Sequence, residues 1–163
     1  MNKKVIVTLS VIALFFMLFS CSSNDDEPEV EQKEEEEVTL EGDYQGLWNS
    51  TTDTDAVFTD FPISAKISFA SSDKTRLRAE FFATSTFTSC CKDEGNDGTI
   101  TMNLEGDAIS SFNFNDQIVN CTGSFTGTGS ITSKDPYTIK IDFTGNDCDG
   151  NHTGELLFTR TKN

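Results

Sequence analysis

The sequence predicts an all-β domain, an eight-stranded antiparallel meander closed into a small barrel. From residue 41 onward, apolar side chains recur at every second position over short stretches. Gly, Asn, Asp, Ser and Pro separate these stretches, as is typical of turns between strands. No part of this region keeps an apolar period of 3.6 residues over about ten positions, so we expect almost no helix.

Four of the expected strands lie in the first half of the domain. The first covers residues 44–50, and the second covers residues 61–69, where Lys66 lies on the face opposite the apolar positions. The third covers residues 76–84, where Glu80 interrupts the apolar positions in the same way. The fourth covers residues 99–104 and turns Met102 inward. Each pattern is that of a strand with one buried face.

The other four strands complete the meander. Phe112 and Phe114 mark the fifth strand, and the sixth covers residues 121–131, where Gly127 and Gly129 suit tight bending. Residues 137–143 and 156–160 form the seventh and eighth strands. Such a sheet must close on itself or expose two edges, and exposed edges favour aggregation. We therefore expect a barrel, with a two-sheet β-sandwich as the alternative.

The first 20 residues have the features of a targeting segment. Lys3 and Lys4 give it a positive start, and an apolar run covers residues 5–19. The run of about 15 residues is shorter than the roughly 20 that a membrane-spanning helix needs. We therefore divide the chain into a signal peptide (residues 1–20), a tether (21–40) and a β-barrel domain (41–163).

Residues 18–21 read Leu-Phe-Ser-Cys and resemble the bacterial lipobox. The resemblance implies that cleavage follows Ser20, that the Cys21 thiol receives a diacylglycerol, and that a further acyl chain such as palmitate is added to the new amine. The partner of the mature chain would then be a membrane. Two alternatives stay open: an ordinary secreted protein with Cys21 near the cut, and an uncleaved membrane helix.

Residues 21–40 are dense in acidic side chains, with four consecutive glutamates at positions 34–37. Like charges repel one another, and the segment has too few apolar side chains to offset the loss of conformational entropy on folding. We therefore expect a disordered tether. Residues 22–27 also resemble the acidic export tag of Bacteroidetes lipoproteins. That resemblance implies anchoring to the outer membrane and display on its outer surface.

The charge of the mature chain excludes one class of partner. Removal of Lys3 and Lys4 with the signal peptide lowers the 12 basic residues to ten, against 27 acidic ones, for a net charge of −17. Nucleic acid and anionic lipid headgroups repel such a chain. We therefore expect no nucleic-acid partner. The sequence does not indicate an oligomeric state.

The remaining four cysteines are Cys90, Cys91, Cys121 and Cys148. An even number in an exported chain favours disulfides over thiols. If residues 133–136 form the turn between the sixth and seventh strands, the register brings Cys121 opposite Cys148 at a distance that suits a disulfide. We predict this bond. Cys90 and Cys91 are then a vicinal bridge or free thiols, and crossed pairs such as Cys91 with Cys121 are the alternative.

We expect no metal site and no cofactor. Zinc is disfavoured because the chain lacks paired Cys-x-x-Cys motifs and its single histidine, His152, lies in an expected turn. Calcium at the acidic loops stays open, because residues 93–98 and 146–151 are rich in Asp and Asn, although neither matches the EF-hand pattern. The acidic residues expected at this end of the barrel are Asp53, Asp55, Asp60, Asp93, Glu94, Asp97, Asp116, Asp147 and Asp149.

No catalytic residues are predicted. Since His152 is the only histidine, Ser–His or Cys–His catalysis requires a nucleophile close to it. Gly123, Gly127 and Gly129 lie within an expected strand and not between a strand and a helix, so they do not form a phosphate-binding loop. We therefore do not expect an enzyme.

The two ends of the domain resemble those of lipocalin-like (calycin) barrels. Residues 46–48 read Gly-Leu-Trp on the first strand, and residues 159–160 read Thr-Arg on the last. The resemblance implies that Arg160 packs on the Trp48 indole in a cation–π contact and closes one end of the barrel. Residues 120–129 also look like part of lipocalin-like lipoproteins from Bacteroidetes. The chain is shorter than typical lipocalins and lacks the helix that usually follows their barrel.

The resemblance implies a ligand pocket. We therefore expect a lipid-anchored binding module that holds an apolar or amphipathic small molecule at its cysteine-bearing end. The inward phenylalanines expected to line this pocket are Phe61, Phe69, Phe81, Phe112, Phe114, Phe125, Phe143 and Phe158. The alternative is a structural or protein-interaction lipoprotein whose barrel is full, because abundant phenylalanine is also typical of a core.

Overall fold

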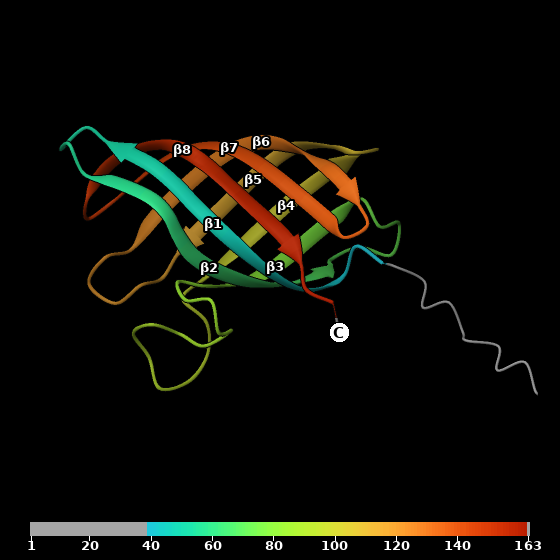
Figure 1. The fold of residues 1–163 in the computed structure, drawn as a ribbon, viewed down its shortest axis with the longest axis horizontal. Helices are drawn as coiled ribbons and strands as arrows, with labels where there is room; N and C mark the ends of the chain where they lie inside the picture. Colours follow the sequence, from blue (N-terminus) through green and yellow to red (C-terminus); the bar gives the residue numbers. More distant parts are fainter. Residues whose placement is uncertain (1–38, 163) are drawn as a thin grey trace, which may run out of the picture. The chain divides into compact units, whose positions relative to one another are not determined.

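Eight antiparallel strands form a closed barrel in the computed structural model, which describes residues 39–162. Each strand pairs with the next along the chain, and β1 also pairs with β8 (Figure 1). The strands are β1 (Gly42–Thr52), β2 (Val57–Phe69), β3 (Arg76–Phe82), β4 (Gly98–Glu105), β5 (Ala108–Asp116), β6 (Gly123–Lys134), β7 (Tyr137–Asp147) and β8 (Gly150–Arg160). The predicted fold class is confirmed, and the sandwich alternative is not formed.

The pairing of β1 with β8 closes the barrel along most of the length of both strands. Tyr44 faces Arg160 at one end of this ladder, and Thr52 faces His152 at the other. Because β1 pairs with β2 on its other side, neither terminal strand leaves its backbone groups unpaired.

The apolar residues expected to face inward form one core. Ile139, Ile141 and Leu156 are fully buried, as are the larger side chains of Phe112 and Phe158. Burial of each such side chain contributes about 1.5–3 kcal/mol to the free energy of folding. The alternation of residue types therefore determines which face of each strand points into the barrel.

Two glycines on β6 are required by the close approach of β7. A Cβ atom on Gly127 would lie 2.2 Å from the carbonyl oxygen of Asp142, and one on Gly129 would lie 2.0 Å from that of Lys140. These distances are far shorter than a carbon–oxygen contact allows. The close approach of β7 therefore requires glycine at both positions, and their predicted role in bending the barrel stays a prediction.

The two ends of the barrel differ. The connections after β1, β3, β5 and β7 (residues 53–56, 83–97, 117–122 and 148–149) gather at one end, which we call the cysteine end. At the opposite end, the Tyr44 hydroxyl donates to the carbonyl of Leu40 over 2.7 Å, and Thr161 N donates to the carbonyl of Asp43 over 2.8 Å. These contacts tie both ends of the domain to the same rim.

The signal peptide, Cys21 and almost all of the tether lie outside the described residues. Between residues 39 and 162, no helix is long and apolar enough to cross a membrane.

Candidate ligand cavity at the cysteine end

A cavity with a volume of about 270 Å³ opens at the cysteine end of the barrel. Its walls come from the inward faces of several strands and from the loops that follow β3, β5 and β7. The lining residues are Trp48, Phe58, Phe61, Ile63, Phe81, Ala83, Cys90, Phe114, Asp116, Ile118, Cys121, Phe125, Asp147, Asp149 and His152. The walls are therefore mostly aromatic and aliphatic, with three carboxyl groups and one imidazole.

An aromatic cluster around Trp48 forms the inner part of this cavity. The Trp48 ring centroid lies 4.3 Å from that of Phe143, 5.1 Å from that of Phe125 and 6.2 Å from that of Phe114. Phe114 and Phe125 stack on each other at 5.5 Å. The separations of Trp48 from Phe125 and Phe114 and the Phe114–Phe125 stack are within the range of favourable aromatic pairs, and Phe143 lies slightly closer than that range. Trp48 is only 7% exposed, so its indole fills the barrel below the cavity.

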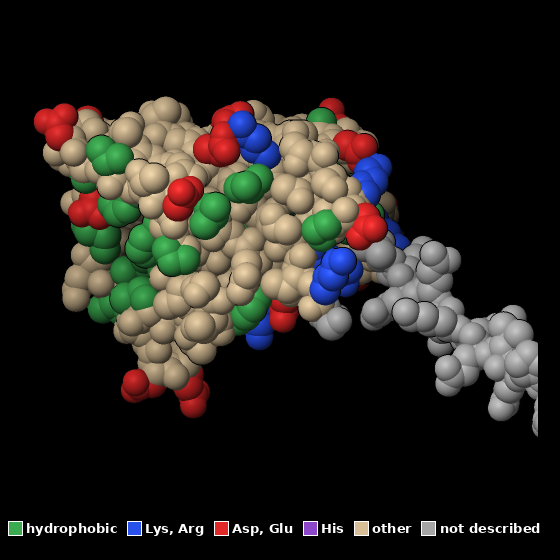
Figure 2. All heavy atoms as spheres, in the orientation of Figure 1, with side chains coloured by type: hydrophobic (Ala, Val, Ile, Leu, Met, Phe, Trp, Pro, Cys, Tyr) green, Lys and Arg blue, Asp and Glu red, His purple; other side chains and the backbone are tan. Residues whose placement is uncertain are grey.

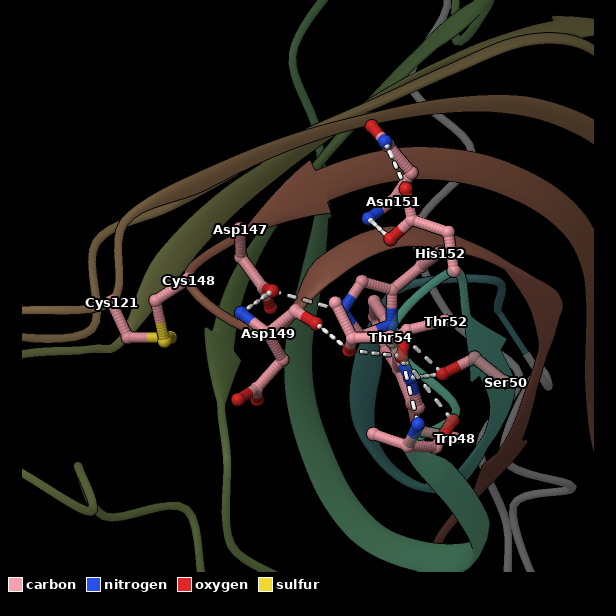
Figure 3. Close-up of polar contacts among 12 residues, drawn as sticks. Trp48, Ser50, Thr52, Thr54, Cys121, Asp147, Cys148, Asp149, Asn151 and His152 are labelled. Carbon is pink, nitrogen blue, oxygen red and sulfur yellow. Dashed lines mark hydrogen bonds and ion pairs between the residues drawn. A yellow bond between two sulfur atoms is a disulfide. The ribbon is translucent and has the colours of Figure 1, made fainter.

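A chain of hydrogen bonds fixes the polar edge of Trp48 (Figure 3). The indole Nε1 donates to Ser50 Oγ over 2.7 Å, Ser50 Oγ lies 3.0 Å from His152 Nδ1, and His152 Nε2 lies 2.9 Å from Asp147 Oδ1. Because Ser50 Oγ accepts from the indole, its own proton goes to Nδ1. The His152 proton then lies on Nε2 and is donated to Asp147. Every member of this buried chain therefore has a partner.

The chain links serine, histidine and aspartate, and each of its hydrogen bonds fixes the side chains that it joins. Ser50 is 6% exposed and is not among the residues that line the cavity. Asp147 Oδ1 also accepts from the backbone N of Asp149 over 2.8 Å. The chain therefore holds Trp48, Asp147 and His152 in fixed orientations in the cavity wall (Figure 3).

Asp116 brings a buried carboxyl group to the cavity. The residue is 5% exposed at the end of β5, and its Oδ1 accepts a hydrogen bond from the backbone N of Ile118 over 2.9 Å. Burial raises the pKa of this carboxyl to about 6, against the lowering effect of that hydrogen bond, and the nearby carboxylates of Asp147 and Asp97 raise it further. No lysine or arginine is among the lining residues described for this cavity.

Two disulfides border the cavity. Cys121 bonds to Cys148 and joins the loop after β5 to the turn after β7, and Cys90 bonds to Cys91. The predicted pairing of Cys121 with Cys148 is confirmed, the vicinal alternative for Cys90 and Cys91 is realised, and crossed pairs are not formed.

The register used to predict that pairing was wrong. The turn between β6 and β7 consists of residues 135–136 only, and a β-bulge shifts the register between Ile131 and Ser133. Phe125 consequently faces Gly145, and both bridged cysteines lie just beyond the ends of the ladder. The disulfide forms between the loops that extend from the hairpin and not across a paired position.

Asp97 holds the loop that carries Cys90. The residue is fully buried, and its Oδ2 accepts from the backbone N of Ala83 over 2.9 Å and from that of Cys90 over 3.0 Å. Its Oδ1 accepts from the Ser89 hydroxyl. Beyond the end of β3, the Asp97 carboxylate therefore accepts the backbone hydrogen bonds that a neighbouring strand would otherwise accept. This fixes Ala83 and Cys90 in the cavity wall.

Half of the predicted ligand-lining phenylalanines lie elsewhere. Phe61, Phe81, Phe114 and Phe125 line the cavity, whereas Phe112, Phe143 and Phe158 are buried in the core and Phe69 lies near the opposite end. The prediction was wrong for these four because a barrel of this size is filled by large side chains over most of its length. The alternation of apolar and polar residues identifies which side chains point into the barrel but not how far each lies from its open end.

The predicted contact of Arg160 with Trp48 is also not formed by the described residues. Trp48 faces Leu156 across the closing ladder, and Arg160 faces Tyr44, four positions away. A Cβ atom on Gly42 would lie 2.7 Å from Arg160 Nε, so the guanidinium lies over the opposite end of the barrel. Trp48 and Arg160 therefore do not form the lipocalin-type closing pair, and Ser50 takes the role of fixing the indole.

Four of the nine acidic residues at the cysteine end, Asp53, Asp97, Asp116 and Asp147, accept hydrogen bonds from the described residues. Asp53 accepts from the backbone N and from Nδ2 of Asn151 over 2.8 and 2.6 Å, and these hydrogen bonds lower its pKa. Carboxylates of Asp147 and Asp149 approach the sulfurs of Cys121 and Cys148, but sulfurs in a disulfide are not thiolate ligands. The expectation of no metal site stays a prediction, with calcium at these loops as the open alternative.

A wider groove of about 850 Å³ is lined by residues of β1, β2, β6, β7 and β8. A row of exposed threonines crosses β1, β6, β7 and β8, because Thr126 faces Thr144, Thr144 faces Thr153 and Thr153 faces Thr51. This groove is more open to solvent and has a more polar lining than the cavity, which is recessed and almost wholly apolar. The cavity is therefore the stronger candidate for a small-molecule site.

The fold and the cavity define a small closed β-barrel with one apolar, acid-edged pocket, an architecture compatible with the lipocalin-like fold. Comparisons of the chain with family models, with curated proteins and with solved structures found no match.

Proposed function

We propose that this protein is a lipid-anchored binding module whose barrel holds an apolar or amphipathic small molecule in the cavity at the cysteine end. The observation that carries the proposal is the cavity itself. Its volume of about 270 Å³ is close to the lower end of ordinary ligand sites, roughly 300 Å³, and its walls are mostly aromatic. Removal of a ligand's apolar surface from water in such a cavity is favourable.

The size of the cavity limits the ligand. A volume of about 270 Å³ corresponds to roughly nine water molecules at about 30 Å³ each. A single ring or a short chain fills this space, and a longer molecule protrudes at the mouth. The exposed Val57, Phe61 and Val119 lie at this end, where Figure 2 shows hydrophobic side chains gathered on the surface. Of these three, Phe61 lines the cavity and offers an apolar contact to the protruding part.

The anchoring part of the proposal rests on the sequence. The lipobox-like residues 18–21 and the acidic segment after them support a lipoprotein of the Bacteroidetes type, attached through Cys21 and displayed at the outer membrane. Labelling of growing cells with an alkyne-bearing palmitate tests this. The wild-type chain should take up the label, Cys21→Ser should not, and equal labelling of the two chains would contradict the anchor.

A second candidate is a structural or protein-interaction lipoprotein with a filled barrel. It is favoured by the packing below the cavity, where Tyr44, Phe112 and Phe158 are each 1% exposed or less. The two candidates differ in whether the cavity takes up a small molecule, so one binding experiment separates them.

The experiment uses Trp48, which is the only tryptophan of the chain and lines the cavity. Titration of the protein with 2-phenylethanol should change the Trp48 fluorescence saturably. Ala83→Leu adds a larger side chain to the cavity wall and should weaken binding about tenfold or more, because the cavity cannot hold both groups. Ala108→Leu, at an exposed position outside the cavity, is the matched control and should bind as the wild type does. A fluorescence that does not respond to the titration would support the filled barrel.

A further inference from the structure

Asp116 is a buried cavity residue with a hydrogen bond to only one of its two carboxyl oxygens. Its side chain lines the cavity and is 5% exposed, and its Oδ1 is occupied by the backbone N of Ile118. The backbone N of Gln117 also lies near this carboxyl, but it donates to the carbonyl of Asp97 over 2.7 Å, and no hydrogen bond from the described residues reaches Oδ2. A buried carboxylate is costly unless it is hydrogen-bonded and paired with a cation. Asp116 Oδ2 can therefore accept a hydrogen bond from a positively charged group of a ligand in the cavity.

The charges around Asp116 are not balanced by the protein. Asp147 and Asp149 also line the cavity, and Asp97 lies next to the backbone position, Gly98, that pairs with Asp116. The imidazole of His152 is directed to Asp147. Lys92, in the loop after β3, donates its Nζ to the carbonyl of Asn96 over 3.2 Å and is not a lining residue.

The aromatic wall suits the same charge. Trp48, Phe114 and Phe125 line the cavity together with Asp116. Ring faces attract a cation, most strongly when water is excluded, and tryptophan does so more strongly than phenylalanine. An apolar body against these rings and a positive group at the carboxyl end of the cavity would satisfy both features at once.

We propose that the ligand is a small amine, with a protonated nitrogen that pairs with Asp116 Oδ2 and an aromatic or short aliphatic body packed against Trp48. This inference rests on the proposed binding function and specifies its ligand class. A neutral ligand of the same shape leaves the Asp116 carboxylate unpaired. An anionic ligand adds a negative charge to a cavity that already holds three carboxyl groups, so the cavity discriminates against it.

Three probes of nearly equal shape test the inference at pH 7.5: 2-phenylethylamine, 2-phenylethanol and 3-phenylpropanoate. Each is titrated into the wild-type protein with Trp48 fluorescence as the readout. The amine should bind about tenfold to 100-fold more tightly than the alcohol, as one charge-assisted hydrogen bond implies. The propanoate should bind more weakly than the alcohol. The preference for the amine should persist at 0.5 M salt, because a recessed pair is screened much less than a surface pair.

Two variants test whether Asp116 causes the preference for the amine over the alcohol. Asp116→Asn removes the carboxylate and should lower the amine affinity to that of the alcohol, while the alcohol affinity changes less than about threefold. Asp142→Asn is the matched control, since it removes the same charge from an exposed position on the outside of β7. It should keep the full preference for the amine.

The outcomes separate this inference from the function on which it rests. Equal binding of the amine and the alcohol to the wild type would overturn the amine inference and leave the binding module in place. A lack of binding by all three probes would overturn both. Loss of the preference in Asp142→Asn as well would assign it to the general field of the protein and overturn the role of Asp116. If Asp116→Asn does not fold, the wild type decides the question. A preference for the amine over the alcohol that persists at 0.5 M salt would support the inference, and a preference lost at that salt concentration would overturn it.

Discussion

The two disulfides should contribute very unequally to stability, although they lie at the same end of the barrel. The Cys121–Cys148 bond closes a loop between residues 27 positions apart, whereas Cys90 and Cys91 are adjacent. In the chain-entropy model, a loop of 27 residues corresponds to about 3.5 kcal/mol of stabilisation at 25 °C. A bond between neighbours closes no loop and removes almost no entropy from the unfolded chain.

The comparison requires two double variants. Cys121→Ser with Cys148→Ser should lower the free energy of unfolding by about 2–4 kcal/mol, which corresponds to a fall in melting temperature of about 10 °C for a domain of this size. Cys90→Ser with Cys91→Ser should change the free energy by less than about 1 kcal/mol. Neither cysteine of the long-range pair is buried, so serine fits both positions.

Urea unfolding, followed by Trp48 fluorescence and by circular dichroism, measures both free energies. The two probes should give coincident transitions for a single domain. Equal losses in the two double variants would refute the reasoning, because the vicinal pair would then stabilise by something other than loop closure. An unchanged free energy in Cys121→Ser with Cys148→Ser would refute it as well.

Three further predictions concern the polar groups of the cysteine end. Ser50→Ala leaves the Trp48 indole N–H and His152 Nδ1 without partners, so unfolding measurements should show a loss of about 2–3 kcal/mol, while the exposed Ser124→Ala should change little. Because burial raises the pKa of Asp116 to about 6, ionisation disfavours the folded state, and wild-type stability should fall relative to that of Asp116→Asn as pH rises from 4 to 7. The full effect is at most about 3 kcal/mol, and water in the cavity reduces it to about 1–2 kcal/mol; a constant difference between the two proteins would contradict this. Calcium or EDTA should shift the melting temperature by less than about 1 °C, and a larger shift would indicate a calcium site.

The fold was predictable because the barrel forms from the alternation of apolar and polar residues. Ile63, Ala65 and Ile67 on β2 are buried as expected, with Lys66 exposed between them. The end of the β7–β8 hairpin was not predictable in the same way. β8 begins at Gly150 and not near Leu156, because its inward positions there are His152 and Gly154, which carry no apolar signal.

The candidate site was predictable only in part. Its location followed from the meander, in which alternate loops share one end. The Cys121–Cys148 bond was predicted from a hairpin register that the bulge between Ile131 and Ser133 shifts, so the pairing was correct but its stated reason was not. The position of each phenylalanine along the barrel axis depends on how far neighbouring strands are offset from one another. The pattern of residue types does not reveal this offset. Phe112 and Phe158 were therefore predicted to line the cavity, although they lie in the core. The Ser50–His152 contact joins residues 102 positions apart and needs the closing ladder of β1 and β8 to become visible.

Native mass spectrometry of the protein purified from its own host tests the central claim most directly, since the claim is that the closed barrel retains a ligand in its cavity. The wild-type chain should carry a bound small molecule, and Ala83→Leu, which fills part of the cavity, should carry less of it than the Ala108→Leu control. Wild-type protein without any bound molecule, at the same mass as its denatured form, would contradict the account.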